Sequence, residues 1–223
     1  MNSRVAAAVE RALDLRQREA TEEVERILES ALVVMERVAP APPRVSDIVE
    51  QAGTSNAAFY RYFSGKDDLI LAVMERGIGL VASYLEHQME KEPTPMAAVA
   101  AWIEGTLAQI SDPRLTSMSR AVVTHLAAHK DTEVAEPLRE LLFEHVVAAD
   151  CPAPEHAADA VFATVMGTLR RHVAAATQPT QPEIDYLVSF CLKAIDPDVP
   201  TSKVTRSRIA GVRQRRRRAK ANP

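Results

Sequence analysis

Residues 44–69 contain the side chains whose types and spacing point most directly to a chemical function, which is contact with DNA. The outward positions of a short helix expected in this stretch are Asn56, Ala57, Tyr60 and Arg61. A phenol or a guanidinium can contact a phosphate, and an amide can pair with the edge of an adenine, although Asn56 could equally be a solvated residue at the helix start. Lys66 adds a positive charge in the first turn of the next expected helix, where the helix end also attracts phosphate.

Two short helices joined by a tight turn must position these residues. Before the turn, apolar residues recur at i, i+3, i+4 and i+7, which is one face of a helix: Val45, Ile48, Val49 and Ala52. Gly53 then supplies the left-handed residue that a sharp turn needs, and Ser55 can cap the second helix through its hydroxyl. Phe59 and Phe63 form the buried face of that helix, and residues 64–67 have the S-x-x-D spacing of a capping box for a third helix. This pattern is typical of a helix-turn-helix.

Residues 52–73 closely resemble the DNA-binding signature of TetR/AcrR-type transcriptional regulators. They read AGTSNAAFYRYFSGKDDLILAV, where the family's pattern reads roughly A-G-V-S-x-G-T-L-Y-x-Y-F-x-x-K-x-x-L. The matching residues are Ala52, Gly53, Ser55, Tyr60, Tyr62, Phe63, Lys66 and Leu69, with Phe59 in the Leu place. The sequence departs from the pattern at Arg44, where a Thr commonly caps the first helix, at Ala57, where Gly is common, and at Ala58, where a Thr often meets DNA. The DNA-contacting positions that follow are Arg44, Ser55, Asn56, Ala57, Ala58, Tyr60, Arg61, Tyr62 and Lys66.

The composition favours a globular, all-α protein. Hydrophobic residues make up 47% and charged residues 26% of the 223 residues, and only seven glycines and few alternating β-type runs are present. Cys151 and Cys191 lack metal or redox spacing, and no signal peptide or membrane-length apolar run is apparent, so we expect a cytoplasmic protein. His125 and His129 stand at i and i+4, but no third ligand completes a metal site. Without a nucleophile elbow, phosphate loop or HExxH motif, we expect neither an enzyme nor a cofactor.

We predict four segments along the chain. Residues 1–20 form an N-terminal arm, 21–67 the helix-turn-helix domain with a helix starting at Thr21, 68–197 a ligand-binding and dimerisation domain, and 198–223 a basic, disordered tail. The arm, with arginines at Arg4, Arg11, Arg16 and Arg18, is either a minor-groove arm or a solvated, partly frayed helix, and the second alternative is favoured. The tail has nine basic side chains, although the net charge of the whole chain is -3, so the rest of the chain is acidic. We expect the tail to add non-specific affinity for phosphate, or else to contact an acidic protein or an anionic membrane.

The second domain is expected to contain long helices, among them 155–176 and 182–195. Large side chains on several of them are explained by core packing alone, or they line an apolar inducer pocket. These residues are Tyr84, Trp102, Met118, Val122, His125, Phe143, Phe162 and Met166. The last two helices carry more apolar surface than a monomer would expose, which predicts a homodimer seam. Its residues are Val161, Val165, Leu169, Val173, Leu187 and Cys191.

The resemblance implies a homodimeric repressor that binds a palindromic operator in double-stranded DNA and is released by a small-molecule effector. The two heads would lie about one DNA turn apart, roughly 34–36 Å. The alternative is a helical dimer that acts through protein partners and has lost sequence-specific DNA binding.

Overall fold

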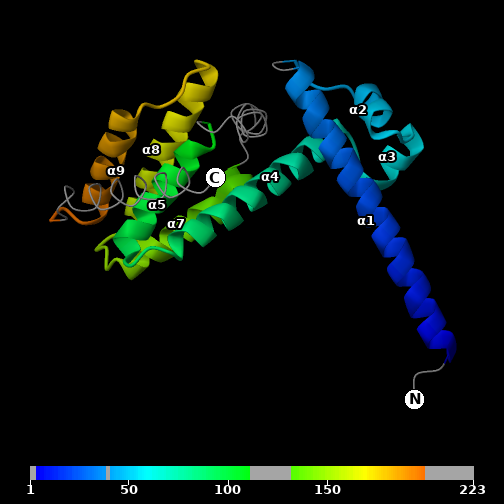
Figure 1. Cartoon of the computed structure of the whole chain (residues 1–223), viewed down its shortest axis with the longest axis horizontal. Helices are drawn as coiled ribbons and strands as arrows, with labels where there is room; N and C mark the ends of the chain where they lie inside the picture. Colours follow the sequence, from blue (N-terminus) through cyan, green and yellow to red (C-terminus); the bar gives the residue numbers. More distant parts are fainter. Residues whose placement is uncertain (1–3, 39–40, 111–131, 199–223) are drawn as a thin grey trace, which may run out of the picture. The chain divides into compact units, whose positions relative to one another are not determined.

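A computed structural model describes residues 4–38, 41–110 and 132–198, and all of the regular structure in these ranges is helical. In chain order the elements are α1 (Arg4–Val38), α2 (Val45–Ala52), α3 (Asn56–Tyr62), α4 (Lys66–Met89), α5 (Pro95–Ala108), the 3-10 helix η1 (Thr132–Ala135), α7 (Glu136–Ala148), α8 (Pro154–Ala174) and α9 (Gln181–Ile195) (Figure 1). The expected all-α class is confirmed. Residues 111–131 and, from residue 199 onward, the predicted basic tail lie outside the described residues.

The chain divides into two compact units, Met1–Gly77 and Ile78–Pro223. The division lies inside α4, beyond the boundary that we expected at residue 67, so that one continuous helix belongs to both units. None of the described helices is both long enough and apolar enough to span a bilayer.

In the first unit, α1 packs along α2, and α2 packs on α3. The core draws apolar side chains from all four helices: Ile27, Ala31, Val34, Met35, Ile48, Val49, Phe59, Phe63, Leu69, Ile70, Val73 and Met74. Arg76 of α4 also pairs with two carboxylates of α1, at 2.7 Å from Glu25 and 3.4 Å from Glu29. These ion pairs tie α4 to α1, and α1 is the helix on which α2 packs.

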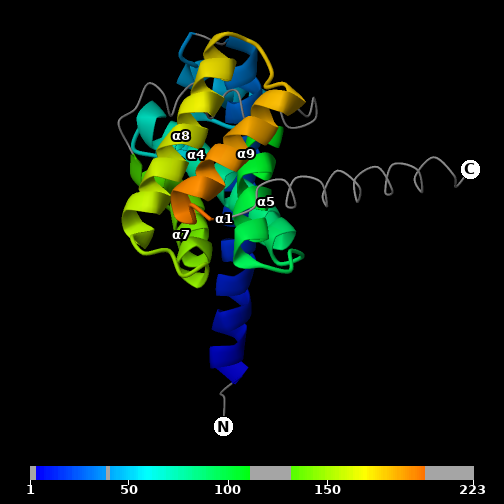
Figure 2. The same ribbon diagram turned by 90° about the vertical axis from the view of Figure 1, so that its left-hand side faces the viewer.

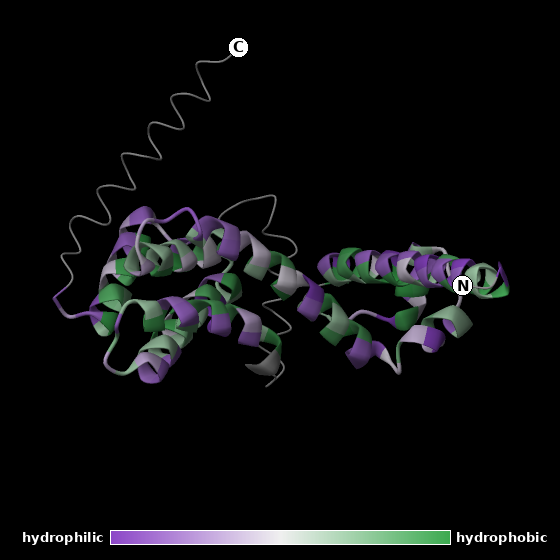
Figure 3. Cartoon of the chain, turned by 90° about the horizontal axis from the view of Figure 1, so that it is seen from below, coloured by the Kyte–Doolittle hydropathy of each residue, from purple (hydrophilic) through white to green (hydrophobic). Residues whose placement is uncertain are grey.

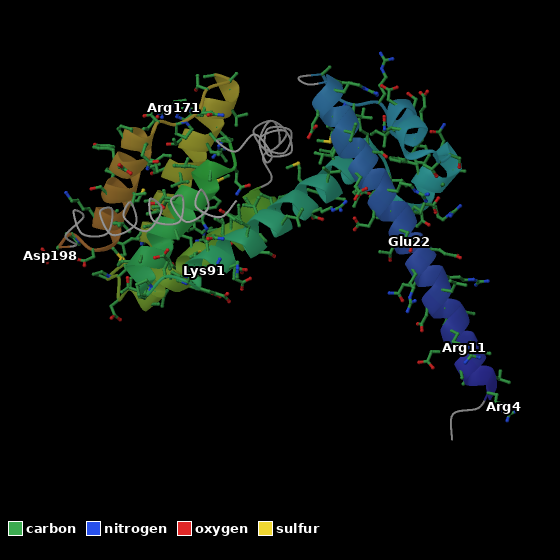
Figure 4. The ribbon with its side chains drawn as sticks, in the orientation of Figure 1. Arg4, Arg11, Glu22, Lys91, Arg171 and Asp198 are labelled. Atoms are coloured by element: carbon green, nitrogen blue, oxygen red, sulfur yellow. The ribbon has the colours of Figure 1, made fainter. Side chains whose placement is uncertain are left out.

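The predicted break between an arm and a helix starting at Thr21 is wrong, because α1 is a single helix of 35 residues. The Thr21 hydroxyl donates to the carbonyl of Gln17, 2.9 Å away, as a residue inside a helix does. No Gly or Pro interrupts α1, and strong helix formers fill it, so acids that favour a helix start also fit its interior. Apolar and polar residues alternate around it (Figure 3), and Arg4 and Arg11 project from its exposed N-terminal part (Figure 4).

The predicted capping box is displaced by one residue. The backbone N–H and the hydroxyl of Ser64 donate to the carboxylate of Asp68, at 2.8 and 3.0 Å, and not to Asp67. Because α4 begins at Lys66, Asp68 is its third residue, which is the position whose carboxylate reaches back to the residues before a helix.

In the second unit, α5 is the central helix and packs against α7, α8 and α9. It is Ala-rich and apolar on every side, and a helix of that kind is stable only when it is covered. Thr94 caps it, since its hydroxyl accepts a hydrogen bond from the N–H of Ala97 at 3.2 Å. The last two helices, α8 and α9, lie side by side (Figure 2). Arg171 and His172 of α8 both approach the Glu183 carboxylate of α9.

Replacing Gly105 of α5 by alanine is expected to destabilise the second unit. A Cβ at this position would lie 2.5 Å from Cδ2 of Leu85, a fully buried side chain of α4 that has little room to move. Overpacking costs about 1–3 kcal/mol, and the better helix propensity of alanine returns up to about 1 kcal/mol. Chemical denaturation should show the loss, whereas Gly79→Ala, with no atom within 4 Å of the added Cβ, should be neutral or stabilising. Equal effects of the two changes would contradict the close approach.

Candidate nucleic-acid interface

The turn between α2 and α3 has the geometry that its glycine predicts. Gly53 has φ 61° and ψ 34°, the left-handed conformation. Its N–H donates to the carbonyl of Glu50 at 3.2 Å, and the N–H of Thr54 donates to the carbonyl of Val49 at 3.0 Å. These two bonds make a Schellman motif, which satisfies the last carbonyls of α2 and redirects the chain within two residues.

The start and the buried side of α3 also agree with the sequence. The Ser55 hydroxyl accepts a hydrogen bond from the N–H of Ala58 at 3.1 Å, which caps the helix as predicted. Phe59 is completely buried, and its ring lies 5.6 Å from that of Phe63 and 5.1 Å from that of Tyr60, edge to face. These ring contacts fix the rotation of α3 about its own axis, so that the opposite side of the helix faces away from the core.

The outward side of α3 carries the four residues expected there. Asn56, Ala57, Tyr60 and Arg61 are all exposed. Tyr60 is 60% exposed although its ring also touches Phe59, so its hydroxyl is directed away from the packed side of the helix. The arrangement presents an amide, a phenol and a guanidinium together on one short helix, a set that suits base edges and phosphates in a major groove.

Three of the predicted DNA-contacting residues are engaged elsewhere. Ala58 is buried, with 6% of its surface exposed, and we exclude it from the interface. The Ser55 hydroxyl is occupied by the cap of α3. The hydroxyl of Tyr62 donates a 2.7 Å hydrogen bond to the carboxylate of Glu23 in α1. Burial and intramolecular bonding, which a linear motif does not reveal, separate these residues from the exposed set.

Glu23 is a residue that sequence reasoning missed. Its carboxylate also accepts a hydrogen bond from the Thr54 hydroxyl at 3.3 Å and lies 3.5 Å from Nη1 of Arg61. The hydrogen bond from Tyr62, aided by Thr54 and Arg61, lowers the pKa of Glu23 below the usual carboxyl range. This contribution to stability is present above the ordinary carboxyl pKa and is lost as the pH falls through the lowered value. No local pattern signals the contact, because more than thirty residues separate the partners.

Two basic residues stand at the ends of the motif. Lys66 is half-buried and is the first residue of α4. Arg44 is exposed and precedes α2; its carbonyl accepts from the N–H groups of Asp47 and Ile48, both at 3.2 Å, while its side chain does not cap the helix. The guanidinium of Arg44 thus has no capping role and remains a candidate for a phosphate contact.

The residues predicted to bind a small molecule are only partly brought together. Trp102 is completely buried and donates from Nε1 to the carbonyl of Leu138 at 3.0 Å, and its ring lies 6.0 Å from that of Phe162. Phe162 also packs against a cluster that contains Met166. Phe143 is half-buried, and Tyr84 is exposed. The other predicted residues lie outside the described part of the chain: Met118, Val122 and His125.

The predicted dimer residues point into the protomer. Five of them, Val161, Val165, Leu169, Leu187 and Cys191, are at most 8% exposed, and Val173 is half-buried. The helices α8 and α9 do pack against each other, but the apolar stripe that we predicted as a seam is the one that these helices bury within the chain. The exposed aromatic residues of α9 are instead Tyr186 and Phe190, at 73% and 53%.

Cys191 is expected to resist alkylation, while Cys151 reacts. Burial raises the pKa of the Cys191 thiol to about 12, so almost no reactive thiolate forms near neutral pH, whereas Cys151 is half-exposed. Treatment of the native protein with iodoacetamide and peptide mass spectrometry should find the label on Cys151 only, and on both cysteines after denaturation. Rapid labelling of Cys191 in the native protein would contradict its burial in the subunit.

In the described residues, no group of three or more His, Cys, Asp or Glu side chains is arranged to hold a metal ion. Unit 1 is a small helical head whose exposed polar groups on α3 are suited to DNA contacts.

Comparison with known proteins agrees with this reading of the first unit. The sequence model of bacterial regulatory proteins of the tetR family matches residues 27–73. The uncharacterized HTH-type transcriptional regulator YvdT of Bacillus subtilis (strain 168) is 43% identical over 51 residues, which are 23% of this chain and 26% of that protein. The sequence similarity to this curated relative thus spans about a quarter of the relative's length.

Solved structures extend the likeness in fold to most of the chain. The fatty acid degradation regulator FadR of Bacillus halodurans has a TM-score of 0.58 at 20% identity, covering 78% of this chain and 94% of that one. RolR in complex with resorcinol has a TM-score of 0.61 at 14% identity, with coverages of 84% and 93%. FadR of Bacillus subtilis in complex with stearoyl-CoA has a TM-score of 0.54 at 17% identity, with coverages of 78% and 98%.

The sequence and the fold of the chain resemble known proteins over different lengths. The helix-turn-helix is matched in sequence, from the second half of α1 to the first half of α4, and the helical body that follows is matched in fold. Residues 27–73 therefore match the DNA-binding part of the tetR family of bacterial regulatory proteins in sequence, and the helical body that follows shares its fold with solved TetR-family regulators.

Proposed function

We propose that this chain is a homodimeric repressor that binds a palindromic operator through α3 and is released from it by a small molecule. The single observation that carries the proposal is the exposed polar face of α3, held by a Schellman turn on one side and a buried phenylalanine pair on the other. A rigid short helix with an exposed amide, phenol and guanidinium is suited to a major groove.

In this proposal the exposed residues have distinct roles. Asn56 and Tyr60 are placed to read base edges or bond to phosphate, while Arg44 and Lys66 at the ends of the motif contact the backbone of the DNA. The first turn of α4 supports Lys66, because unpaired N–H groups at a helix start attract phosphate. Ala57, which is exposed beside Asn56, offers a small apolar surface that suits a thymine methyl group.

We place the dimer interface on the outward side of α8 and α9, around Tyr186 and Phe190. Two large aromatic side chains that are more than half exposed on one helix are unusual on a free surface. Small residues of α8 are exposed as well, namely Ala160, Ala163 and Gly167, and they would allow close approach of a partner helix. A two-fold dimer of this kind carries two heads, which is the reason to expect a palindromic operator.

The effector is proposed to bind within the second unit, near Trp102, Phe162 and Met166. Two solved structures that are similar in fold hold ligands as different as resorcinol and stearoyl-CoA, so the fold does not restrict the chemical class of the effector. In this chain the Thr106 hydroxyl of α5 is buried and has no hydrogen-bond partner among the described residues, and a buried hydroxyl of this kind favours a ligand that supplies a partner. An effector that is mainly apolar and carries a hydroxyl or carbonyl group would suit these surroundings.

DNA binding is tested by titrating the purified full-length protein with labelled DNA from beside its own gene and with random DNA of equal length. The proposal requires preference for one fragment over random DNA at several salt concentrations, because non-specific binding alone is electrostatic and salt-dependent. Equal affinity for every fragment, or none, would favour a helical dimer that acts through protein partners. Release by a small molecule is tested on the same complex with a panel of apolar hydroxyl and carbonyl compounds, resorcinol among them.

A further inference from the structure

The Glu23 carboxylate of α1 gathers three donors from the reading part of the head. Tyr62 at the end of α3 donates at 2.7 Å, Thr54 in the turn before α3 donates at 3.3 Å, and Arg61 lies 3.5 Å away. These donors come from both ends of the short helix. One carboxylate on α1 therefore holds α3 at its beginning and at its end.

The three donors are of the types that contact phosphate in protein–DNA complexes: two hydroxyls and one guanidinium. In this structure the acceptor that the three donors share is the carboxylate of Glu23. Glu23 lies outside residues 27–73, the part of the chain that matches the family, so the family match assigns it no role.

The donors are not held equally. Tyr62 is half-buried, and its short hydrogen bond is made with the carboxylate at the edge of the core. Arg61 has 62% of its side chain exposed and pairs at a longer distance, while Glu23 itself is 22% exposed. An exposed pair of this geometry is weak, and a phosphate can replace the carboxylate as its partner. The bond from Tyr62, in contrast, is the one that fixes the end of α3.

We propose that Glu23 is a positioning residue that anchors α3 through Tyr62 and Thr54 and withholds Arg61 from the DNA backbone. This inference rests on the proposed DNA-binding function and deepens it. Reading bases requires a fixed placement of α3, whereas non-specific binding requires only positive charge. Anchoring α3 thus favours the operator, and a carboxylate beside Arg61 disfavours DNA of every sequence. Together the two effects raise the ratio of operator affinity to random-DNA affinity.

Two substitutions at position 23 separate the two effects. Glu23→Gln removes the charge, but its amide keeps an oxygen and an N–H that can bond to Tyr62 and Thr54. It should tighten operator and random DNA by a similar factor, roughly threefold for each newly available phosphate contact, and steepen the salt slope by about 0.9 per head. Glu23→Ala removes the anchor as well. It should tighten random DNA but weaken the operator, so that the ratio of the two affinities falls about tenfold or more.

Matched variants control for simpler explanations. Glu22 is the exposed neighbouring residue on α1 (Figure 4). Glu22→Gln removes the same charge, but it should raise the affinity for DNA less than Glu23→Gln does and should leave the salt slope unchanged. In an Arg61→Ala background, Glu23→Gln should raise the affinity for DNA by no more than Glu22→Gln does. Tyr62→Phe removes one hydroxyl without changing any charge, and it should weaken the operator while leaving random DNA unchanged.

The anchor can also be measured without DNA, which separates failure of this inference from failure of the proposed function. Hydrogen exchange of the amides of α3 should quicken in Glu23→Ala and Tyr62→Phe, and should be unchanged in Glu22→Gln. Unchanged exchange in both anchor variants overturns the positioning role, whether or not the wild type prefers an operator. If Glu23→Gln and Glu22→Gln shift both DNA affinities equally, Glu23 acts only as a surface charge and the withholding of Arg61 is wrong. If Glu23→Ala does not fold, Tyr62→Phe still decides the positioning role.

Discussion

Phe190→Asp is expected to convert a dimer of this protein into a monomer and to lower operator affinity more than a hundredfold. Phe190 is 53% exposed on the outward side of α9, where we place the seam. An aspartate there would either bury an unpaired charge, at a cost of several kcal/mol, or keep the seam open. A monomer binds each half-site separately and loses the effective concentration that ties the second head to its site, which accounts for a factor of roughly 10²–10⁴.

Sedimentation velocity of the variant and its titration with operator DNA measure these two results. The matched control is Val147→Asp, which places the same charge at a 47% exposed apolar side chain of α7 in the same unit and should leave the dimer intact. Leu169→Asp serves as a second comparison, because Leu169 is only 4% exposed and the charge should unfold the subunit rather than dissociate it. A stable Phe190→Asp dimer would place the interface elsewhere.

Tyr60→Ala is expected to weaken operator binding by about 1–3 kcal/mol per head, or roughly 5- to 150-fold for each half-site. The phenol is 60% exposed on α3, and its ring rests edge to face on the buried Phe59, so the helix loses little packing when it is removed. Lys66→Ala should weaken operator and random DNA alike and make the plot of log affinity against log salt shallower by about one for each lost phosphate contact.

Fluorescence anisotropy with operator and random DNA across a salt series distinguishes the two variants. Circular dichroism and sedimentation should show unchanged helix content and assembly. Leu80→Ala is the control, since it removes a 54% exposed side chain of α4 that belongs to the second unit. Wild-type affinity of both head variants at every salt concentration would remove α3 and the start of α4 from the DNA interface.

Much of the head could be predicted from sequence because its signals are local. A left-handed glycine after a run of helical apolar residues, a serine three residues before the N–H that it caps, and two phenylalanines four residues apart each specify their geometry within one or two turns. The exposed set Asn56, Ala57, Tyr60 and Arg61 follows from the same helical period, once the buried side is known.

Where local signals are ambiguous, the prediction failed. The acidic residues after Thr21 are favourable at a helix start, but they are also compatible with the interior of a helix. The packing of α1 on α2 stabilises the continuous helix that is observed. In the same way, Ser64 bonds to Asp68 because the first residue of α4 is Lys66, which the S-x-x-D spacing alone did not determine.

The sequence by itself determined the helical class, the turn before α3, the cap of α3 and the family signature, since each depends on residues within a few positions of one another. Only the tertiary structure decided which apolar stripe of α8 and α9 is buried within the chain. Both helices have apolar side chains on more than one side, and the helical period alone does not indicate which side packs against the other helices of the chain. The tertiary structure alone brought Glu23 to Thr54, Arg61 and Tyr62, since contacts over 31 to 39 residues arise from the packing of whole helices.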